Sequence, residues 1–187
     1  MVSTSSLLRA TADSRRDFER DALPYLSAVY GFALRLTHRR EDAYDLTQDT
    51  FLRAFQRFSA FTQGTNCKAW LFTITYSIFV NGYHRQRREP TALSIDHDVI
   101  ASPNAPDGSG SAAARAGTAA DVEAALAELS SEFRSVVLLV DVEGLSYEEA
   151  ADVLACPIGT VRSRLFRART LLADRLRAYD APGRRRS

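Results

Sequence analysis

The chain has 187 residues, of which 45% are hydrophobic and 25% are charged, and its formal net charge is +1. This composition is typical of a folded soluble protein and excludes a collagen-like, disulfide-dense or wholly disordered chain. The sequence has no apolar run long enough to span a membrane, and it does not begin with a recognisable secretory signal. We therefore expect a cytoplasmic protein, with Cys67 and Cys156 as reduced thiols that are too isolated to form a zinc site.

Charge and composition divide the chain into segments. Residues 121–157 carry nine acidic side chains and one basic, whereas residues 158–187 carry nine arginines and two acidic side chains. Residues 90–120 contain no aromatic residue and several Pro, Gly and Ser, which is typical of a linker that buries too little surface to fold. We predict a disordered N-terminus, a compact part, a flexible linker, a second compact part and a basic tail, over 1–13, 14–89, 90–120, 121–180 and 181–187.

The first compact part is predicted to be helical over 17–36, 42–58 and 70–83, with a turn at 64–66. The middle helix has an apolar stripe, which comprises Leu46, Phe51, Leu52, Phe55 and Phe58. Asp42, Asp45 and Asp49 share another face of the same helix. The β-branched residues between 73 and 80 are compatible with a strand, but the length of the segment and the absence of a partner strand favour a helix.

The second compact part is predicted to contain helices over 122–129, 134–142, 146–154 and 158–179. Gly144 marks the end of one helix, and Ser146 with Glu149 fits a capping box at the start of the next. The turn at 155–157 then leads into a long basic helix. A short helix, a tight turn and a basic helix form the pattern of a helix-turn-helix DNA-binding motif.

The long helix separates an apolar face from a basic one. Helical spacing places Val161, Leu165, Ala168 and Leu172 on one narrow face, which we expect to pack on the preceding helix. The opposite side carries Arg162, Ser163, Phe166 and Arg167. Arginine suits guanine edges and phosphates, and an exposed phenylalanine suits a thymine methyl group. The alternative is that the arginines only solvate the helix and that Phe166 packs locally; we favour DNA binding.

Three segments resemble a known family. Residues 145–151 and 156–169 resemble region 4 of extracytoplasmic-function (ECF) sigma factors, residues 45–55 resemble region 2.2, and residues 68–74 resemble the start of region 2.3. They occur in the order of the family, with a linker where the family has one. The resemblance implies an all-α fold with two small domains, a region 2 helical bundle and a region 4 helix-turn-helix. It also implies no enzymatic activity, no cofactor and no metal.

The resemblance assigns roles to individual positions. Those expected to bind the minus-35 element in the major groove are Thr160, Arg162, Ser163, Phe166 and Arg167. Those expected to capture the minus-10 strand are Tyr76, Ser77, Asn81, Tyr83, Arg85, Arg87 and Arg88. Those expected to bind the core polymerase are Asp45, Gln48, Asp49, Phe51 and Arg53. Many members of the family have Asn where this chain has Ser77, so the base recognised there is open.

The function implied by the resemblance is promoter-specific transcription initiation in a stress response. The expected partners are core RNA polymerase, through the clamp helices of its largest subunit, promoter DNA and an anti-sigma factor; no membrane insertion and no small-molecule substrate are expected. The segments 83–90 and 141–144 look closest to the thiol-oxidative-stress branch, whose members are commonly held by a zinc-containing anti-sigma protein. The sequence does not specify the promoter or the inducing signal. It also does not specify a redox role for either cysteine.

Two other classes of function compete with this one. A stand-alone helix-turn-helix regulator would use residues 14–89 for dimerisation or effector binding, but it has no need of the segment 45–55. An enzyme such as a nuclease would need a metal-ligand cluster, a phosphate-binding loop or a nucleophile beside a base. His38, His84 and His97 are scattered and supply none of these.

Overall fold

The computed structural model describes residues 15–88 and 119–180, with only the backbone described at 83–88 and 178–180. All regular elements in these ranges are helical, as the sequence predicted. Both predicted terminal segments and nearly all of the predicted linker lie outside the described residues. The second helical unit begins at Ala119, within the range that the sequence assigned to the linker.

The first helical unit starts with a helix over residues 15–21, followed by the 3₁₀ turn η1 (Leu23–Tyr25) and helix α2 (Leu26–Thr37). The sequence predicted one helix over 17–36, and Pro24 divides it. A proline has no N–H to donate and its ring crowds the preceding turn, so a regular helix stops there. Helix α2 ends at His38, which adopts the left-handed conformation with φ 58°.

Helix α3 (Arg40–Gln56) and the 3₁₀ turn η2 (Phe58–Ala60) come next in the chain. The buried side chains of α3 are Ala43, Leu46, Thr47, Thr50 and Ala54. The predicted apolar stripe was wrong in part, because Leu52 and Phe55 are 56% and 47% exposed. The threonines can be buried because their hydroxyls donate to backbone carbonyls one turn back, Thr47 to Ala43 and Thr50 to Leu46, both at 2.7 Å.

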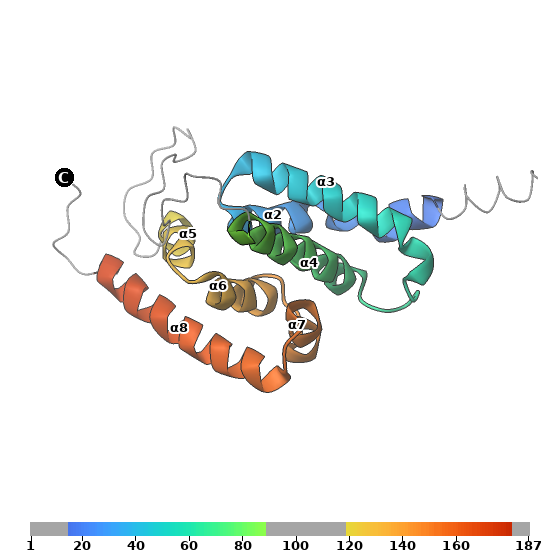
Figure 1. Ribbon diagram of the computed structural model, residues 1–187. Helices are drawn as coiled ribbons and strands as arrows, with labels where there is room; N and C mark the ends of the chain where they lie inside the picture. The colour runs from blue at the N-terminus through green and yellow to red at the C-terminus, as the bar shows by residue number, and fades with distance from the viewer. Residues whose placement is uncertain (1–14, 89–118, 181–187) are drawn as a thin grey trace, which may run out of the picture.

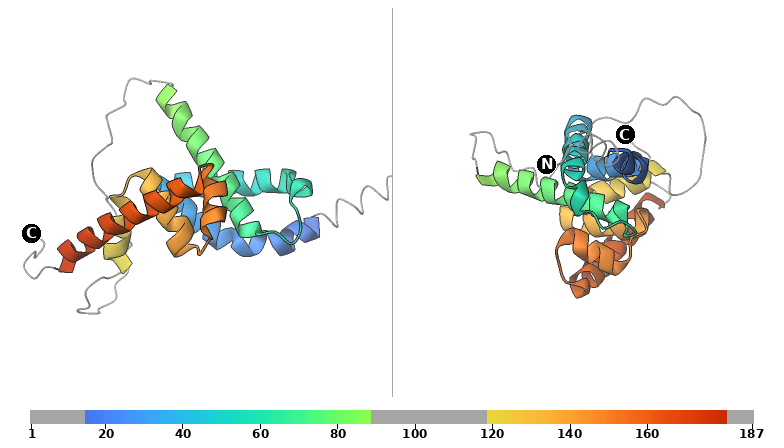
Figure 2. Two further views of the ribbon diagram at one scale, coloured as in Figure 1. Left: turned by 90° about the horizontal axis from the view of Figure 1, so that it is seen from below. Right: turned by 90° about the vertical axis from the view of Figure 1, so that its right-hand side faces the viewer.

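Helix α4 (Cys67–Arg88) is continuous and longer than predicted. The turn before it contains Gly64 with φ 88°, a conformation that favours glycine. Leu71 and Phe72 are fully buried, and so is Thr75, whose hydroxyl donates to the Leu71 carbonyl at 2.9 Å. The C-terminal turns of α4, drawn in light green in Figure 2, project away from the rest of the bundle.

The second unit contains α5 (Ala119–Ala127), α6 (Ser131–Val137), a π-helical segment (Leu138–Val142), α7 (Tyr147–Leu154) and α8 (Ile158–Asp180). The capping box is confirmed: the Ser146 hydroxyl accepts from the Glu149 N–H at 3.1 Å, and the Glu149 carboxylate accepts from the Ser146 N–H at 2.8 Å. Ala155, in the turn between α7 and α8, has φ 49°. The sequence did not predict the π-helical geometry.

A buried arginine closes the end of α5. The Arg134 side chain on α6 is almost fully buried and donates to the carbonyls of Leu126 at 2.9 Å, Ala127 at 2.8 Å and Leu129 at 2.6 Å. Carbonyls at a helix end lack the donors of a following turn, so the guanidinium supplies donors here, in addition to the Leu129 N–H, which donates to the Leu126 carbonyl at 3.2 Å. Burial lowers the pKa of Arg134, which remains charged at physiological pH.

The two helical units share one hydrophobic core. Phe32, Leu71 and Phe72 of the first unit belong to the same buried cluster as Leu139 and Val153 of the second. Figure 1 shows α4 between α2 and α3 on one side and α6 and α7 on the other. The sequence predicted two compact parts on a flexible tether, and it contained no indication that they would pack together.

Candidate nucleic-acid and polymerase interfaces

The face of α8 that the sequence assigned to DNA is open to solvent. Val161, Leu165 and Ala168 are at most 1% exposed and pack inward, as the helical spacing predicted. On the opposite side Arg162, Ser163 and Arg167 are exposed, and Phe166 is 74% exposed. A phenylalanine side chain this exposed contributes little to the stability of the helix. It gives the surface an apolar group that a ligand can contact.

The arginines of α8 fall into two groups. Arg164 pairs with Glu132 at 3.0 Å, Arg169 pairs with Asp141 and Arg175 pairs with Glu128 at 2.7 Å, so these three attach α8 to its own unit. Arg167 has no ion pair among the described residues, and the Arg162 guanidinium lies 5.9 Å from the centre of the Tyr147 ring. The two arginines on the open face are therefore available for a ligand.

The remaining minus-35 candidates lie at the start of α8. Thr160 is half-buried, and its carbonyl accepts a hydrogen bond from the Ser163 hydroxyl at 3.1 Å. The turn before α8 brings these residues to the N-terminal end of the helix, which is the end that enters the major groove in helix-turn-helix proteins. All five predicted minus-35 residues thus lie in the first three turns of α8.

The minus-10 candidates on α4 are presented unequally. Ser77 and Asn81 are exposed. Tyr76 is half-buried with Ser135 of the second unit near its hydroxyl, and burial raises the pKa of that hydroxyl. The backbone of Tyr83, Arg85, Arg87 and Arg88 lies on the projecting end of α4, and their side chains are outside the described residues.

The polymerase candidates on α3 divide in the same way. Asp45, Gln48, Asp49 and Arg53 are exposed. Phe51 is half-buried and packs edge-on against Phe18, with ring centres 6.3 Å apart, so its role is chiefly in the core. The apolar stripe read from the sequence included Phe51, and this part of the stripe is confirmed.

Sequence reasoning missed apolar residues on the same surface. Tyr44, Leu52 and Phe55 of α3 are 57%, 56% and 47% exposed, and Leu52 follows Asp45 and Asp49 at helical spacing on one face. The sequence contained the signal, because the aspartates and Leu52 share one helical face. Apolar periodicity alone instead places Leu52 and Phe55 in the stripe that faces the core.

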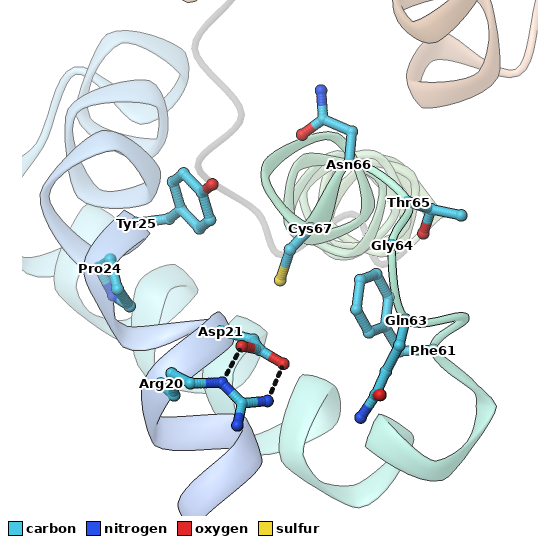
Figure 3. A pocket seen from close by; sticks show the side chains of 10 residues that line it. All are labelled: Arg20, Asp21, Pro24, Tyr25, Phe61, Gln63, Gly64, Thr65, Asn66 and Cys67. Carbon is cyan, nitrogen blue, oxygen red and sulfur yellow. Dashed lines mark hydrogen bonds and ion pairs between the residues drawn. The ribbon is translucent and has the colours of Figure 1, made fainter.

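A pocket of about 470 Å³ lies beside η1 and the start of α4, and Figure 3 shows its lining. The Arg20 guanidinium is already paired with the Asp21 carboxylate at 2.7 Å. The Cys67 side chain faces the pocket in Figure 3, and burial raises the pKa of its thiol to about 11. The thiol is therefore protonated at neutral pH, which suits a packing role better than a reactive one.

The described residues hold no group of three His, Cys, Asp or Glu side chains placed to bind a metal ion. Within the same ranges, no helix combines the length and the apolarity needed to cross a lipid bilayer.

Comparison with known proteins agrees with this geometry. Residues 23–89 match the family model for sigma-70 region 2, and residues 119–172 match that for sigma-70 region 4. The ECF RNA polymerase sigma factor SigE of Mycolicibacterium smegmatis is 40% identical over 82% of this chain, which spans 59% of the length of SigE. The ECF RNA polymerase sigma factor EcfG of Rhodopseudomonas palustris is 36% identical over 86% of this chain and 84% of EcfG.

A solved structure matches both helical units together. The sigma factor RpoE of Bartonella quintana, in complex with the anti-sigma factor NepR, superposes with a TM-score of 0.72 and 34% identity over 87% of this chain and 98% of RpoE. Similarity in sequence to both sigma regions, in this order and over most of the chain, is joined by similarity in three dimensions. The chain therefore belongs to the ECF family of RNA polymerase sigma factors, which are transcription initiation factors and not enzymes.

Proposed function

We propose that this sigma factor places three separate surfaces on one transcription complex. The exposed face of α8 reads the minus-35 duplex, the outer face of α4 captures the minus-10 strand, and the exposed face of α3 binds the clamp helices of the largest subunit of core polymerase. Because both DNA contacts are attached to one polymerase, each acts at a high effective concentration although each is weak alone.

The observation that carries the proposal is the division of labour among the arginines of α8. Arg164, Arg169 and Arg175 are held by carboxylates of their own unit, while Arg162 and Arg167 flank the exposed Phe166. If the arginines served only solubility, this separation into carboxylate-paired and unpaired side chains on different faces of α8 would not be expected. Arg162 and Arg167, which have no carboxylate partner among the described residues, can contact guanine edges or phosphates in the major groove.

The polymerase surface combines charge with apolar anchors. Asp45 and Asp49 supply carboxylates that steer association, and Leu52 lies about one turn beyond Asp49 on the same exposed face. Tyr44 and Phe55 widen the apolar part of this surface. A surface that combines apolar anchors with surrounding charge is the common form of a protein-binding site.

The test is transcription in vitro with purified core RNA polymerase and a library of promoter fragments. Phe166→Ala should reduce transcription from promoters that depend on the minus-35 element while leaving binding to core polymerase unchanged. Arg177→Ala is the matched control, because Arg177 lies on the same helix, is highly exposed and, within 15–88 and 119–180, pairs only with the exposed Asp174. Equal losses in the two variants would contradict the assignment of the α8 face.

A second experiment isolates the polymerase surface. Asp49→Arg should weaken capture of core polymerase, since it replaces a carboxylate with a cation on an exposed face and removes no packing. Glu148→Gln, on the exposed side of α7, is the control. Normal capture by the Asp49→Arg variant would reject this interface, and tight promoter binding without polymerase would favour the stand-alone regulator instead.

Control by an anti-sigma factor in the cytoplasm is part of the proposal. Its support is the similarity to RpoE, which was solved with the anti-sigma factor NepR. Membership of the thiol-oxidative-stress branch stays a prediction from the segments 83–90 and 141–144. In the segment 141–144, Asp141 and Glu143 both have ion-pair partners within the chain. Co-purification of a zinc protein that releases the sigma factor on thiol oxidation would support that branch, and a partner insensitive to oxidation would contradict it.

A further inference from the structure

The two helical units are joined by polar contacts as well as by the shared core. The Asn66 amide donates to the Glu149 carboxylate at 2.7 Å, and Arg35 pairs with Glu123 at 2.8 Å. Lys68, the only lysine of the chain, makes the most enclosed contact of this set. Each contact bridges two segments that lie on opposite sides of the predicted linker.

Lys68 makes two interactions with Glu143, one with its carboxylate and one with its backbone carbonyl. The ammonium nitrogen of Lys68 lies 2.8 Å from the Glu143 carboxylate and 2.8 Å from the Glu143 backbone carbonyl. The two side chains are 23% and 10% exposed, and the Lys68 nitrogen is 5.7 Å from the centre of the Phe72 ring. A charge enclosed to this degree is costly to leave alone, so removing either partner strongly favours the arrangement in which the other reaches water.

The same arrangement covers a minus-10 candidate. Tyr76 is half-buried, and Ser135 of α6 and Arg164 of α8, which lie near its hydroxyl, both belong to the second unit. Capture of an unpaired base by stacking requires an open aromatic face. While the second unit lies here, Tyr76 is only partly open, although Ser77 beside it is exposed.

We propose that the Lys68–Glu143 pair is the latch of a closed, self-inhibited state, in which the second helical unit covers the strand-capturing face of α4. The inference rests on the function proposed above for α4. The free protein populates the closed state, and binding of polymerase and promoter selects the open one. The apparent affinity of the free chain for single-stranded DNA is then its intrinsic affinity multiplied by the open fraction.

The first measurement is the shape of the full-length protein by small-angle X-ray scattering. Glu143→Gln should enlarge the radius of gyration relative to the wild type, because it removes the charge that Lys68 faces. Glu148→Gln is the matched control, as Glu148 is exposed and has no ion pair among the described residues. A Glu143→Gln protein as compact as the wild type would overturn the latch.

The second measurement is binding of a fluorescent single-stranded minus-10 oligonucleotide by the free protein. Glu143→Gln should bind it about tenfold more tightly than the wild type, whereas Glu148→Gln should not. An expanded variant with unchanged oligonucleotide affinity would overturn the inhibitory role of the closed state. If the gain appears but survives in a Tyr76→Ala/Glu143→Gln double variant, the latch stands and the function proposed for Tyr76 fails.

Reversing the charges of Lys68 and Glu143 distinguishes opening of the pair from misfolding. Lys68→Glu and Glu143→Lys should each open the protein, and the double variant Lys68→Glu/Glu143→Lys should return towards the compact, weakly binding state. Circular dichroism shows whether each variant keeps its helices. If the double variant is as open as the two single ones, the pair is not the latch.

Discussion

Helices α8 and α4 both carry residues that we assign to promoter DNA, but they present them differently. On α8 the reading face is bare, with Phe166 74% exposed between two available arginines. On α4 the aromatic candidate Tyr76 is half-buried under the second unit. The surface that we propose for duplex DNA is therefore open in the free chain, whereas the one that we propose for the melted strand is partly covered. Such an order suits a factor that meets duplex DNA before it holds an open strand.

The largest effect should come from destroying the inner face of α8. Leu165→Ala removes a side chain that is 1% exposed and should lower the free energy of unfolding by about 2–5 kcal/mol. Urea denaturation measures this, with Leu171→Ala on the same helix as control, since Leu171 is 39% exposed and should change stability by less than about 0.5 kcal/mol. Similar losses in both variants would show that α8 does not pack as described.

Substitutions on the outer face of α8 should change promoter recognition and leave the free energy of unfolding nearly unchanged. Arg167→Ala should weaken minus-35 binding by about 1–3 kcal/mol. Competition between promoters with intact and altered minus-35 elements measures this in the polymerase complex. Arg164→Ala is the informative contrast, because it loses the ion pair with Glu132 and should affect promoter choice less. Unchanged promoter choice in the Arg167→Ala variant would count against the contrast between the two groups of arginines.

The covered face of α4 should respond to loss of a single hydroxyl. Tyr76→Phe keeps an aromatic ring for stacking but removes a half-buried hydroxyl whose neighbours Ser135 and Arg164 belong to the second unit, which should shift the closed–open equilibrium towards the open state. Oligonucleotide binding by the free protein should improve severalfold, while binding of minus-35 duplex should stay the same. A decrease in oligonucleotide affinity would mean that the hydroxyl contacts DNA.

The smallest effect is expected in the turn that separates α7 from α8. Ala155 adopts φ 49°, where a Cβ is unfavourable, so Ala155→Gly should relieve strain. The greater freedom of glycine in the unfolded chain offsets part of this gain, which leaves a net stabilisation of up to about 1 kcal/mol. Thermal unfolding measures it, and a lower melting temperature would show that the turn is not strained.

The sequence predicted α8 well because one helix packing on its own unit leaves a simple pattern. Val161, Leu165 and Ala168 repeat at helical spacing, and Ser146 with Glu149 marks the start of α7 through local hydrogen bonds. On α3 the same reasoning failed in part, because alanines and threonines share the buried face with Leu46 while Leu52 and Phe55 lie outside. Apolar periodicity cannot distinguish a core from a binding surface when both are present on one helix.

The joining of the two units was beyond sequence reasoning for a different physical reason. Lys68 and Glu143 are 75 positions apart, and no sequence pattern around either residue indicates that the two make contact. The divided charge of the chain showed that acidic residues are concentrated over 121–157, but it did not say that one of them would enclose a lysine. Long-range ion pairs depend on tertiary geometry that local periodicity does not encode.

The π-helical segment Leu138–Val142 gives this chain an unusual sensitivity to length. Within and just after this wide turn, Asp141 holds Arg169 of α8 and Glu143 holds Lys68 of α4. A π-turn is equivalent to one residue inserted into an α-helix, and its wide winding gives Asp141 and Glu143 directions that an ordinary α-helix would not. Deleting one residue of this turn would restore ordinary winding and change the directions of these two carboxylates relative to Arg169 and Lys68. Such a deletion would weaken the contacts of this turn with both α8 and α4, without a substitution in either helix.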